Sequence, residues 1–302
     1  MTIVENKVTG YLTANFSETE TAWSSGSTYS YKSEARDGHY IYAYTGNANT
    51  NTTASPATFS QTDPLTPWVQ MRPTNYWAML DGRTDSQTAV LNQIVIEISD
   101  INYDYVSILD IDGINVAYEL KDSVGTVVYS LTNNLQDESA IIDFYTYCFS
   151  PFLFKKNDLV SLPIYGGTSK LKITLNASTG NYAKIGRLVF GNSFFIADTA
   201  MGGSLGLESY SPRSVDPFGN ATLTHIGAVN LQSFQVRLHT SLIPTIQRKI
   251  IALDAIPCLF IMDETVTSNV ENLLTYGYWQ DFNINHKGCN YSYASTTLKG
   301  LL

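Results

Sequence analysis

Short apolar runs separated by turn residues dominate residues 76–191. Seven such runs, rich in Ile, Val, Leu and Tyr, lie at residues 89–98, 105–111, 114–122, 126–131, 159–166, 170–177 and 183–191. Turn-forming residues follow three of them, at 112–113, 123–125 and 166–167. Strands joined by such turns are typical of an antiparallel β-sandwich. The pattern predicts a jelly-roll or galactose-binding-like sandwich over residues 76–191, within a mainly β protein.

The N-terminal quarter follows an aromatic pattern that predicts a small β module over residues 1–75. Alternation in residues 39–44 puts Tyr40, Tyr42 and Tyr44 on one face of a strand. We therefore expect one aromatic row of this module to be exposed. A long run of Asn, Thr, Ser and Pro after residue 45 predicts a loop before Pro67 and Trp68.

The C-terminal third, residues 192–302, predicts a compact α+β unit with one helix. Apolar residues recur every three or four positions between residues 242 and 256, and Pro244 lies in the first turn of this stretch. The expected apolar stripe consists of Ile243, Ile246, Ile250, Leu253 and Ile256. Strand-like runs before and after the helix predict the sheet that this stripe covers.

Composition limits the kinds of partner. Only 15% of the 302 residues are charged, against about 25% in an average soluble domain. The net charge is −9 and no segment concentrates Lys or Arg, so a phosphate backbone would be repelled. The 20 Tyr and 13 Phe residues are of the kind that protein interfaces favour. We expect protein partners and no nucleic acid.

Neither terminus nor interior suggests export or a membrane span. The N-terminal residues lack the basic start and apolar run of a secretory signal, and no stretch approaches about 18 apolar residues. We expect a chain that is made and kept in a cytoplasm. Three widely spaced cysteines, Cys148, Cys258 and Cys289, fit neither a disulfide framework nor a metal knuckle, so we expect small buried or strand residues.

Residues with catalytic or ligand-binding potential are scattered. The four histidines, at positions 39, 225, 239 and 286, lack metal-ligand spacing. Residues 110–115 begin like a calcium loop but lack its later ligands, which favours a turn. Residues 201–206 are glycine-rich, but Pro212 prevents the helix that a phosphate loop needs. Carboxylate pairs for glycoside hydrolysis are defined in space, so the sequence neither shows nor excludes one. We predict a non-enzymatic protein without cofactor or metal.

One resemblance concerns the aromatic module. The order Trp23, Gly26, Tyr29, then residues 38–42, then Pro67 and Trp68 resembles the small chitin-binding modules of chitinases. That resemblance implies aromatic side chains that stack on sugar rings, with Trp23, Tyr29, Tyr42 and Trp68 as the candidates. Tryptophan and tyrosine also build ordinary small cores. We expect Trp23 and Trp68 to be core residues.

A second resemblance covers residues 20–302. The run from Thr74 to Gly82, with Gln87 and Thr88 after it, is similar to a segment of structural tail proteins from tailed bacteriophages. Further matching pieces follow in order at residues 125–129, 184–191, 197–211, 216–223 and 298–302. The resemblance implies a tail-tube-like or distal-tail-like fold for residues 192–302 that assembles into rings. It gives structural roles to Asn75, Trp77, Asp81 and Gly82.

Together these patterns lead to one leading hypothesis. The chain is expected to be a structural component of a phage tail or baseplate, assembled in the host cytoplasm and located in the virion. Its partners would be further copies of itself in a ring and neighbouring tail proteins. The main alternative is a glycan-binding adhesin whose first module contacts host polysaccharide. A cell-wall-degrading enzyme is the weaker third hypothesis.

Overall fold

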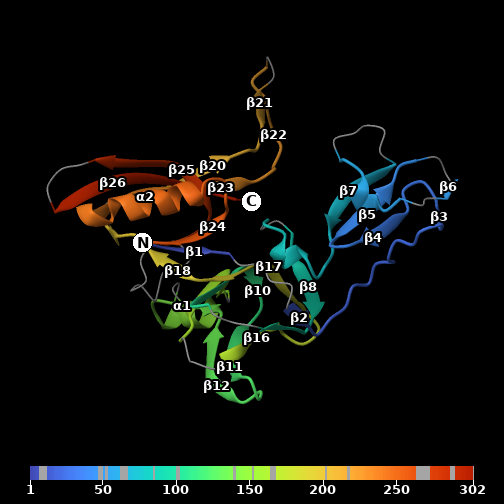
Figure 1. Ribbon diagram of the computed structural model, residues 1–302, viewed down its shortest axis with the longest axis horizontal. Coiled ribbons are helices and arrows are strands. Elements are labelled where there is room, and N and C mark those ends of the chain that lie inside the picture. The colour runs from blue at the N-terminus through green and yellow to red at the C-terminus, as the bar shows by residue number, and fades with distance from the viewer. Residues whose placement is uncertain are drawn as a thin grey trace.

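The computed structural model describes the chain except residues 7–11, 47–49, 52–53, 62–66, 84–85, 100–102, 139–140, 152, 164–167, 201–202, 216–217, 263–272, 286–289 and 302. The fold is mainly β, as predicted, and every pairing between its named strands is antiparallel (Figure 1). Figure 1 shows three bodies: a small sheet module at one end of the long axis, a large sheet with a helix at the other, and a sandwich below them.

The sandwich consists of a four-stranded and a five-stranded sheet that share one core. The first sheet has the order β15 (Asn157–Ser161), β10 (Tyr105–Asp112), β17 (Tyr182–Gly191) and β8 (Thr88–Leu91). The second has the order β12 (Val127–Asn134), β11 (Asn115–Asp122), β16 (Thr168–Asn176), β9 (Gln93–Ser99) and β2 (Leu12–Ala14). Burial alternates along β9 and β11, so every second side chain enters the core. The alternating apolar residues of β9 and β11 thus form part of the inner face of a sandwich-like fold.

The expected turns connect these strands in two different ways. Residues 123–125 close a hairpin between β11 and β12, with Gly125 at φ +95°. Residues 112–113 instead carry the chain from β10 in one sheet to β11 in the other. Gly113 leaves room for this crossing. A Cβ at this position would lie 2.5 Å from Leu175 Cδ1, which is too close. The predicted turn at residues 166–167 lies outside the described residues.

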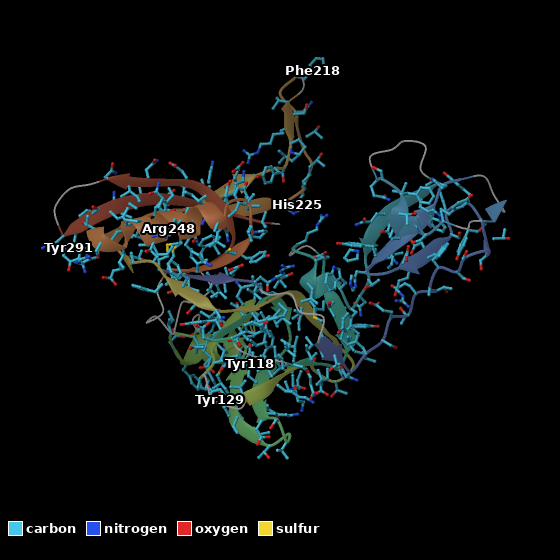
Figure 2. The ribbon with its side chains drawn as sticks, viewed as in Figure 1. Tyr118, Tyr129, Phe218, His225, Arg248 and Tyr291 are labelled. Carbon is cyan, nitrogen blue, oxygen red and sulfur yellow. The ribbon has the colours of Figure 1, made fainter. Side chains whose placement is uncertain are left out.

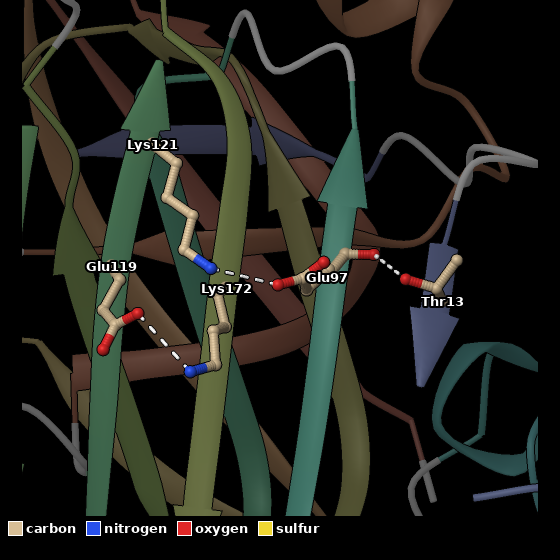
Figure 3. A network of polar contacts seen from close by, with 5 residues as sticks. All are labelled: Thr13, Glu97, Glu119, Lys121 and Lys172. Atoms are coloured by element: carbon tan, nitrogen blue, oxygen red, sulfur yellow. Dashed lines mark hydrogen bonds and ion pairs between the residues drawn. The ribbon is translucent and has the colours of Figure 1, made fainter. Parts of the chain in front are cut away.

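The outer face of the five-stranded sheet is charged. Lys121 on β11 reaches across β16 to Glu97 on β9, with 3.1 Å between Nζ and Oε1 (Figure 3). A second ion pair joins Lys172 on β16 to Glu119 on β11, with 3.5 Å between Nζ and Oε2. At the edge of the sheet, Thr13 Oγ1 on β2 donates a hydrogen bond to the Glu97 carbonyl at 3.5 Å. Cross-strand ion pairs on a partly exposed face stabilise a sheet only slightly.

The third body is one long sheet covered by a helix. Its strands have the order β18 (Ser193–Phe195), β1 (Thr2–Glu5), β24 (Cys258–Ile261), β25 (Leu274–Asn285), β26 (Tyr291–Gly300), β23 (Ala228–His239) and β19 (Asp198–Thr199), and β20 (Ser204–Ser209) also pairs with β23. Helix α2 (Ile243–Ala252) follows a short 3₁₀ turn, η3 (Thr240–Leu242). Ile246 and Leu253 pack into a core with Phe234 and Phe260.

The predicted apolar stripe of α2 is correct at four of its five positions. Ile243, Ile246 and Leu253 are buried and Ile250 is partly buried. Ile256 is exposed, contrary to the expectation. The reason is local: the helix ends at Ala252, and Ala255 has φ +58°, which turns the chain away from the helix axis.

The small module contains β4 (Glu34–Asp37), β5 (Tyr40–Tyr44) and β7 (Trp68–Pro73), with the two-residue strands β3 (Thr28–Tyr29) and β6 (Thr50–Asn51) paired beside them. A 3₁₀ turn, η1 (Pro56–Thr58), precedes β7. The expected exposed row of tyrosines is wrong. Tyr42 and Tyr44 are buried, because the fully buried Trp68 lies against this face. Side-chain period showed which residues share a face but not what covers it.

Residues 1–75 do not all belong to this module. Strand β1 lies inside the long sheet, between β18 and β24, and β2 forms an edge of the sandwich. The N-terminal amine of Met1 donates to the Ala197 carbonyl at 2.6 Å. The first 14 residues therefore link the two larger bodies, and the aromatic module begins after them.

Two projections were not predicted. In the first, β13 (Gln136–Asp137) pairs with β14 (Leu153–Phe154) to form a stem, and helix α1 (Phe144–Phe149) lies between these strands in the chain. The second projection is a hairpin of β21 (Arg213–Val215) and β22 (Ala221–Leu223), which extends away from the long sheet (Figure 1).

Candidate functional site: a motif junction and exposed apolar projections

The motif at residues 74–88 is held together by hydrogen bonds of Asn75. The Asn75 side chain donates to the Ala89 carbonyl at 3.1 Å and accepts from the Ala89 N–H at 2.9 Å. Thr88 Oγ1 donates to the Asn75 carbonyl at 2.7 Å and accepts from Met79 N–H at 3.1 Å. Asn75 thus pairs with β8 as a neighbouring strand would, and fixes the 3₁₀ turn η2 (Ala78–Leu80) beside it.

Asp81 and Gly82 complete the motif. The Asp81 carboxylate accepts from Arg83 N–H at 2.8 Å and from Ser86 Oγ at 2.6 Å. Gly82 has φ +95°, a conformation that favours glycine. A Cβ on Gly82 would lie 3.8 Å from Nη1 of Arg187, so this turn lies next to a charged side chain of β17.

Arg187 joins the sandwich to the long sheet. Only 3% of it is exposed, and its Nη2 donates to the Tyr276 hydroxyl at 2.8 Å. Its guanidinium also lies over the Tyr276 ring, 4.9 Å from the centroid. Burial raises the pKa of Tyr276, and Arg187 partly offsets that effect. The tyrosine is therefore a neutral acceptor for a buried cation.

Trp77 connects the same motif to the small module. Its ring stacks on His39 with 3.8 Å between ring centroids and an interplanar angle of 14°. Next to this stack, the Thr74 N–H donates to the His39 carbonyl at 2.9 Å. The motif residues thus join the small module to the sandwich, where Gly82 lies beside Arg187, the residue that reaches the long sheet. The contacts of Asn75, Trp77, Asp81 and Gly82 are structural.

The four candidate sugar-stacking residues gather in one place, but in a core. Trp68 is fully buried, with Tyr29 edge-on at 5.0 Å and Tyr44 at 5.1 Å between ring centroids. Tyr42 is buried, and desolvation, followed by the charge of Asp37, raises its pKa. Trp23 is half-buried against the same cluster. A stacking platform needs open ring faces, which Trp68 and Tyr42 lack.

Clusters for metal or phosphate chemistry are not formed by the residues that the structure describes. Among them no three His, Cys, Asp or Glu side chains converge, and no helix is long and apolar enough to cross a membrane. Asp112 forms an ion pair with Lys184 at 3.4 Å. Residues 204–206 enter strand β20, so no helix follows that glycine-rich segment. His286 and Cys289 lie outside the described residues.

The cysteines differ from the prediction in one case. Cys258 is buried in β24, as expected, and burial with Glu5 nearby raises its pKa to about 12. Cys148 is exposed on α1, contrary to expectation. The apolar neighbours of Cys148 on α1 are exposed as well.

Large exposed apolar side chains concentrate on the two projections. On and beside α1 they are Ile142, Phe144, Tyr145, Tyr147, Phe149, Leu153 and Phe154. On the hairpin and the strands leading to it they are Leu205, Leu207, Tyr210, Val215, Phe218, Leu223 and Ile226. Figure 2 shows Phe218 at the hairpin tip, away from the rest of the molecule. Contiguous apolar surface of this kind marks interaction sites.

Comparisons with known proteins give little similarity. No family model matches the chain, and no curated protein sequence matches it. Among solved structures, one similar chain is described as the lectin domain of lectinolysin complexed with Lewis B antigen, at 11% identity and a TM-score of 0.26. The match covers 38% of this chain and 82% of that one. A TM-score this low does not establish a shared fold.

Proposed function

We propose that the protein is a non-enzymatic structural component of a tailed-phage tail or baseplate. The observation that carries the proposal is the concentration of exposed apolar side chains on α1 and on the β21–β22 hairpin. Such side chains left in water are unfavourable, and burying them against neighbouring subunits removes that cost. The tail-protein-like motif at residues 74–88 supports the class, because it joins the small module to the sandwich.

The experiment is to locate the protein in the particle. Antibody labelling of purified virions, viewed by electron microscopy, should place the protein on the tail or its tip. Light scattering of the purified chain should give a mass above that of one subunit. Unlabelled virions, together with a chain that stays monomeric and captures no tail protein, would overturn the proposal.

The adhesin alternative would need residues other than those the sequence suggested. Trp68 and Tyr42 are buried, so sugar stacking on them requires the small module to open. A glycan array with the whole chain separates the two hypotheses. Binding that survives Trp23→Ala would place the sugar site elsewhere, whereas an array without binding would remove the adhesin hypothesis.

A further inference from the structure

Helix α1 is unusual because it buries none of its own residues. Its N-terminus is closed by a capping box, in which Asp143 Oδ1 accepts from Thr146 N–H at 2.7 Å and Thr146 Oγ1 accepts from Asp143 N–H at 3.0 Å. Tyr145 and Phe149, one turn apart, have ring centroids 4.9 Å apart. These contacts set the direction of the helix but cover little of its surface.

Local contacts alone do not account for the stability of this helix. Isolated helices shorter than about 12–15 residues are marginal in water, and those in proteins are stabilised by packing of one face. Helix α1 has six residues, all without a buried side chain, on a stem of two-residue strands. We therefore expect α1 to be stabilised by packing against a surface outside the stem.

The exposed area matches half of an ordinary interface. Phe144, Tyr145, Tyr147 and Phe149 are 69–81% exposed. At about 150–250 Å² for each aromatic side chain, they offer on the order of 400–750 Å². Ile142, Leu153 and Phe154 add to this surface. A standard interface buries about 800 Å² on each partner, so this surface has the size of one partner's share.

The charge pattern favours a second copy of the same surface. Asp143 is the one charged residue between positions 141 and 154 of the sequence. Its carboxylate is already bound to Thr146 of its own helix, and these hydrogen bonds lower its pKa. The stem beside this stretch carries Asp137 and Glu138 on one side and Lys155 and Lys156 on the other, two charges of each sign. Two such surfaces can therefore meet without a net repulsion between like charges.

We propose that α1 packs against α1 of a second copy of this chain, about a two-fold axis. A contact of this type uses the same patch on both partners, and here the patch is apolar and aromatic, with few charges inside it. The inference rests on the self-assembly part of the proposed function and names a surface that pairs two copies; a ring needs a further, head-to-tail contact.

Cys148 provides the test, because it lies on α1 one turn after Phe144 and is exposed. In a Cys289→Ser chain, copper-phenanthroline should oxidise two Cys148 thiols to one disulfide, with two electrons passing to the oxidant. Cys258 is buried, with a pKa raised to about 12, and should not react. We expect a covalent dimer on a non-reducing gel, and its loss in the Cys148→Ser, Cys289→Ser chain.

A paired variant separates α1 from the other projection. Phe144→Ser with Phe149→Ser should weaken self-association by about tenfold or more, as loss of central aromatic residues does at interfaces. The melting temperature of the subunit should not fall, because neither side chain is buried. Phe218→Ser, which removes a 90% exposed ring at the hairpin tip, should leave the Cys148 disulfide intact.

Three results would overturn the inference. One is an oligomer that persists in the α1 double variant, which leaves the proposed function standing. Another is an oligomer whose Cys148 thiols never crosslink. The third is co-sedimentation of the chain with phosphatidylcholine vesicles that is lost in the α1 double variant, which would assign the surface to a membrane. Failure of virion labelling would count against the proposed function instead.

Discussion

At the scale of single residues, Gly191 decides how closely the sandwich approaches the long sheet. It ends β17, and a Cβ there would lie 2.0 Å from the Glu5 carbonyl oxygen and 3.4 Å from Val4 Cγ1 of β1. Contacts under 3 Å with backbone atoms require the strands to shift. The glycine is therefore needed for close approach, since its φ is not in the left-handed region.

Gly191→Ala should lower the free energy of unfolding by about 1–3 kcal/mol or more, as overpacking of a tight interior does. Chemical denaturation followed by tryptophan fluorescence measures this. Gly206→Ala is the matched control, because its nearest neighbouring atom, the Leu231 carbonyl oxygen, is at an ordinary 3.7 Å. Equal stability of the two variants would show that β1 and β17 are not held this closely.

Tyr276→Phe tests the buried cation. The change removes the hydroxyl that accepts from Arg187 Nη2 but keeps the ring beneath the guanidinium. We expect a loss of about 1.5–3 kcal/mol of stability, the range for hydrogen bonds to charged groups. Tyr182→Phe, on the exposed surface of β17, is the control and should change nothing. If the melting curve of Tyr276→Phe were unchanged, a water molecule would be accepting the hydrogen bond of Arg187 Nη2 in place of the tyrosine hydroxyl.

At the scale of elements, the sequence predicted helix α2 but not helix α1. Spacing of apolar residues predicted α2 because its buried face lies on its own chain. Helix α1 was missed because six residues are too few to show a repeated spacing, and no residue that the structure describes buries its apolar side chains. The signal that could have revealed α1 is the capping pair of Asp143 and Thr146 before an aromatic run.

Helix α2 permits a comparison of one substitution at two sites. Ile246→Asp places a carboxylate in the core with Phe234 and Phe260, and should unfold the long sheet or destabilise it by several kcal/mol. Ile251→Asp, at a side chain that is 66% exposed on the same helix, should cost well under about 1 kcal/mol. Circular dichroism melting measures both. Similar melting temperatures would mean that α2 does not pack on the sheet.

At the scale of the whole molecule, the small module meets the rest of the protein at the motif of residues 74–88. Figure 1 shows it at the end of the long axis opposite the long sheet. The His39–Trp77 stack and the bond from Thr74 N–H to the His39 carbonyl lie where the module meets the motif. The position of the module in an assembly therefore depends on these residues.

His39→Ala should loosen the module without unfolding either larger body, because aromatic pairs contribute about 0.5–1.5 kcal/mol. Hydrogen exchange at the Thr74 amide should accelerate by about threefold to tenfold, and small-angle scattering should show a broader range of sizes. His225→Ala, an exposed histidine at the base of the hairpin, is the control. Unchanged protection at Thr74 would indicate that other contacts fix the module.

The sequence by itself determined the local part of this structure. Period-two alternation, turn residues and the spacing in α2 depend on residues close together in the chain, so the β content, most sandwich strands and the helix could be predicted. Trp68 could also be predicted as core, since a ring of that size in a small module has nowhere else to be buried.

Only the tertiary structure decided which distant segments meet. Strand β1 lies beside β24, more than 250 residues later, and Arg187 finds Tyr276 across two bodies. It also decided that Tyr42 is covered and that the aromatic side chains of α1 are not. The physical reason is that side-chain period shows which residues share a face, whereas burial of that face depends on segments whose approach leaves no local mark in the sequence.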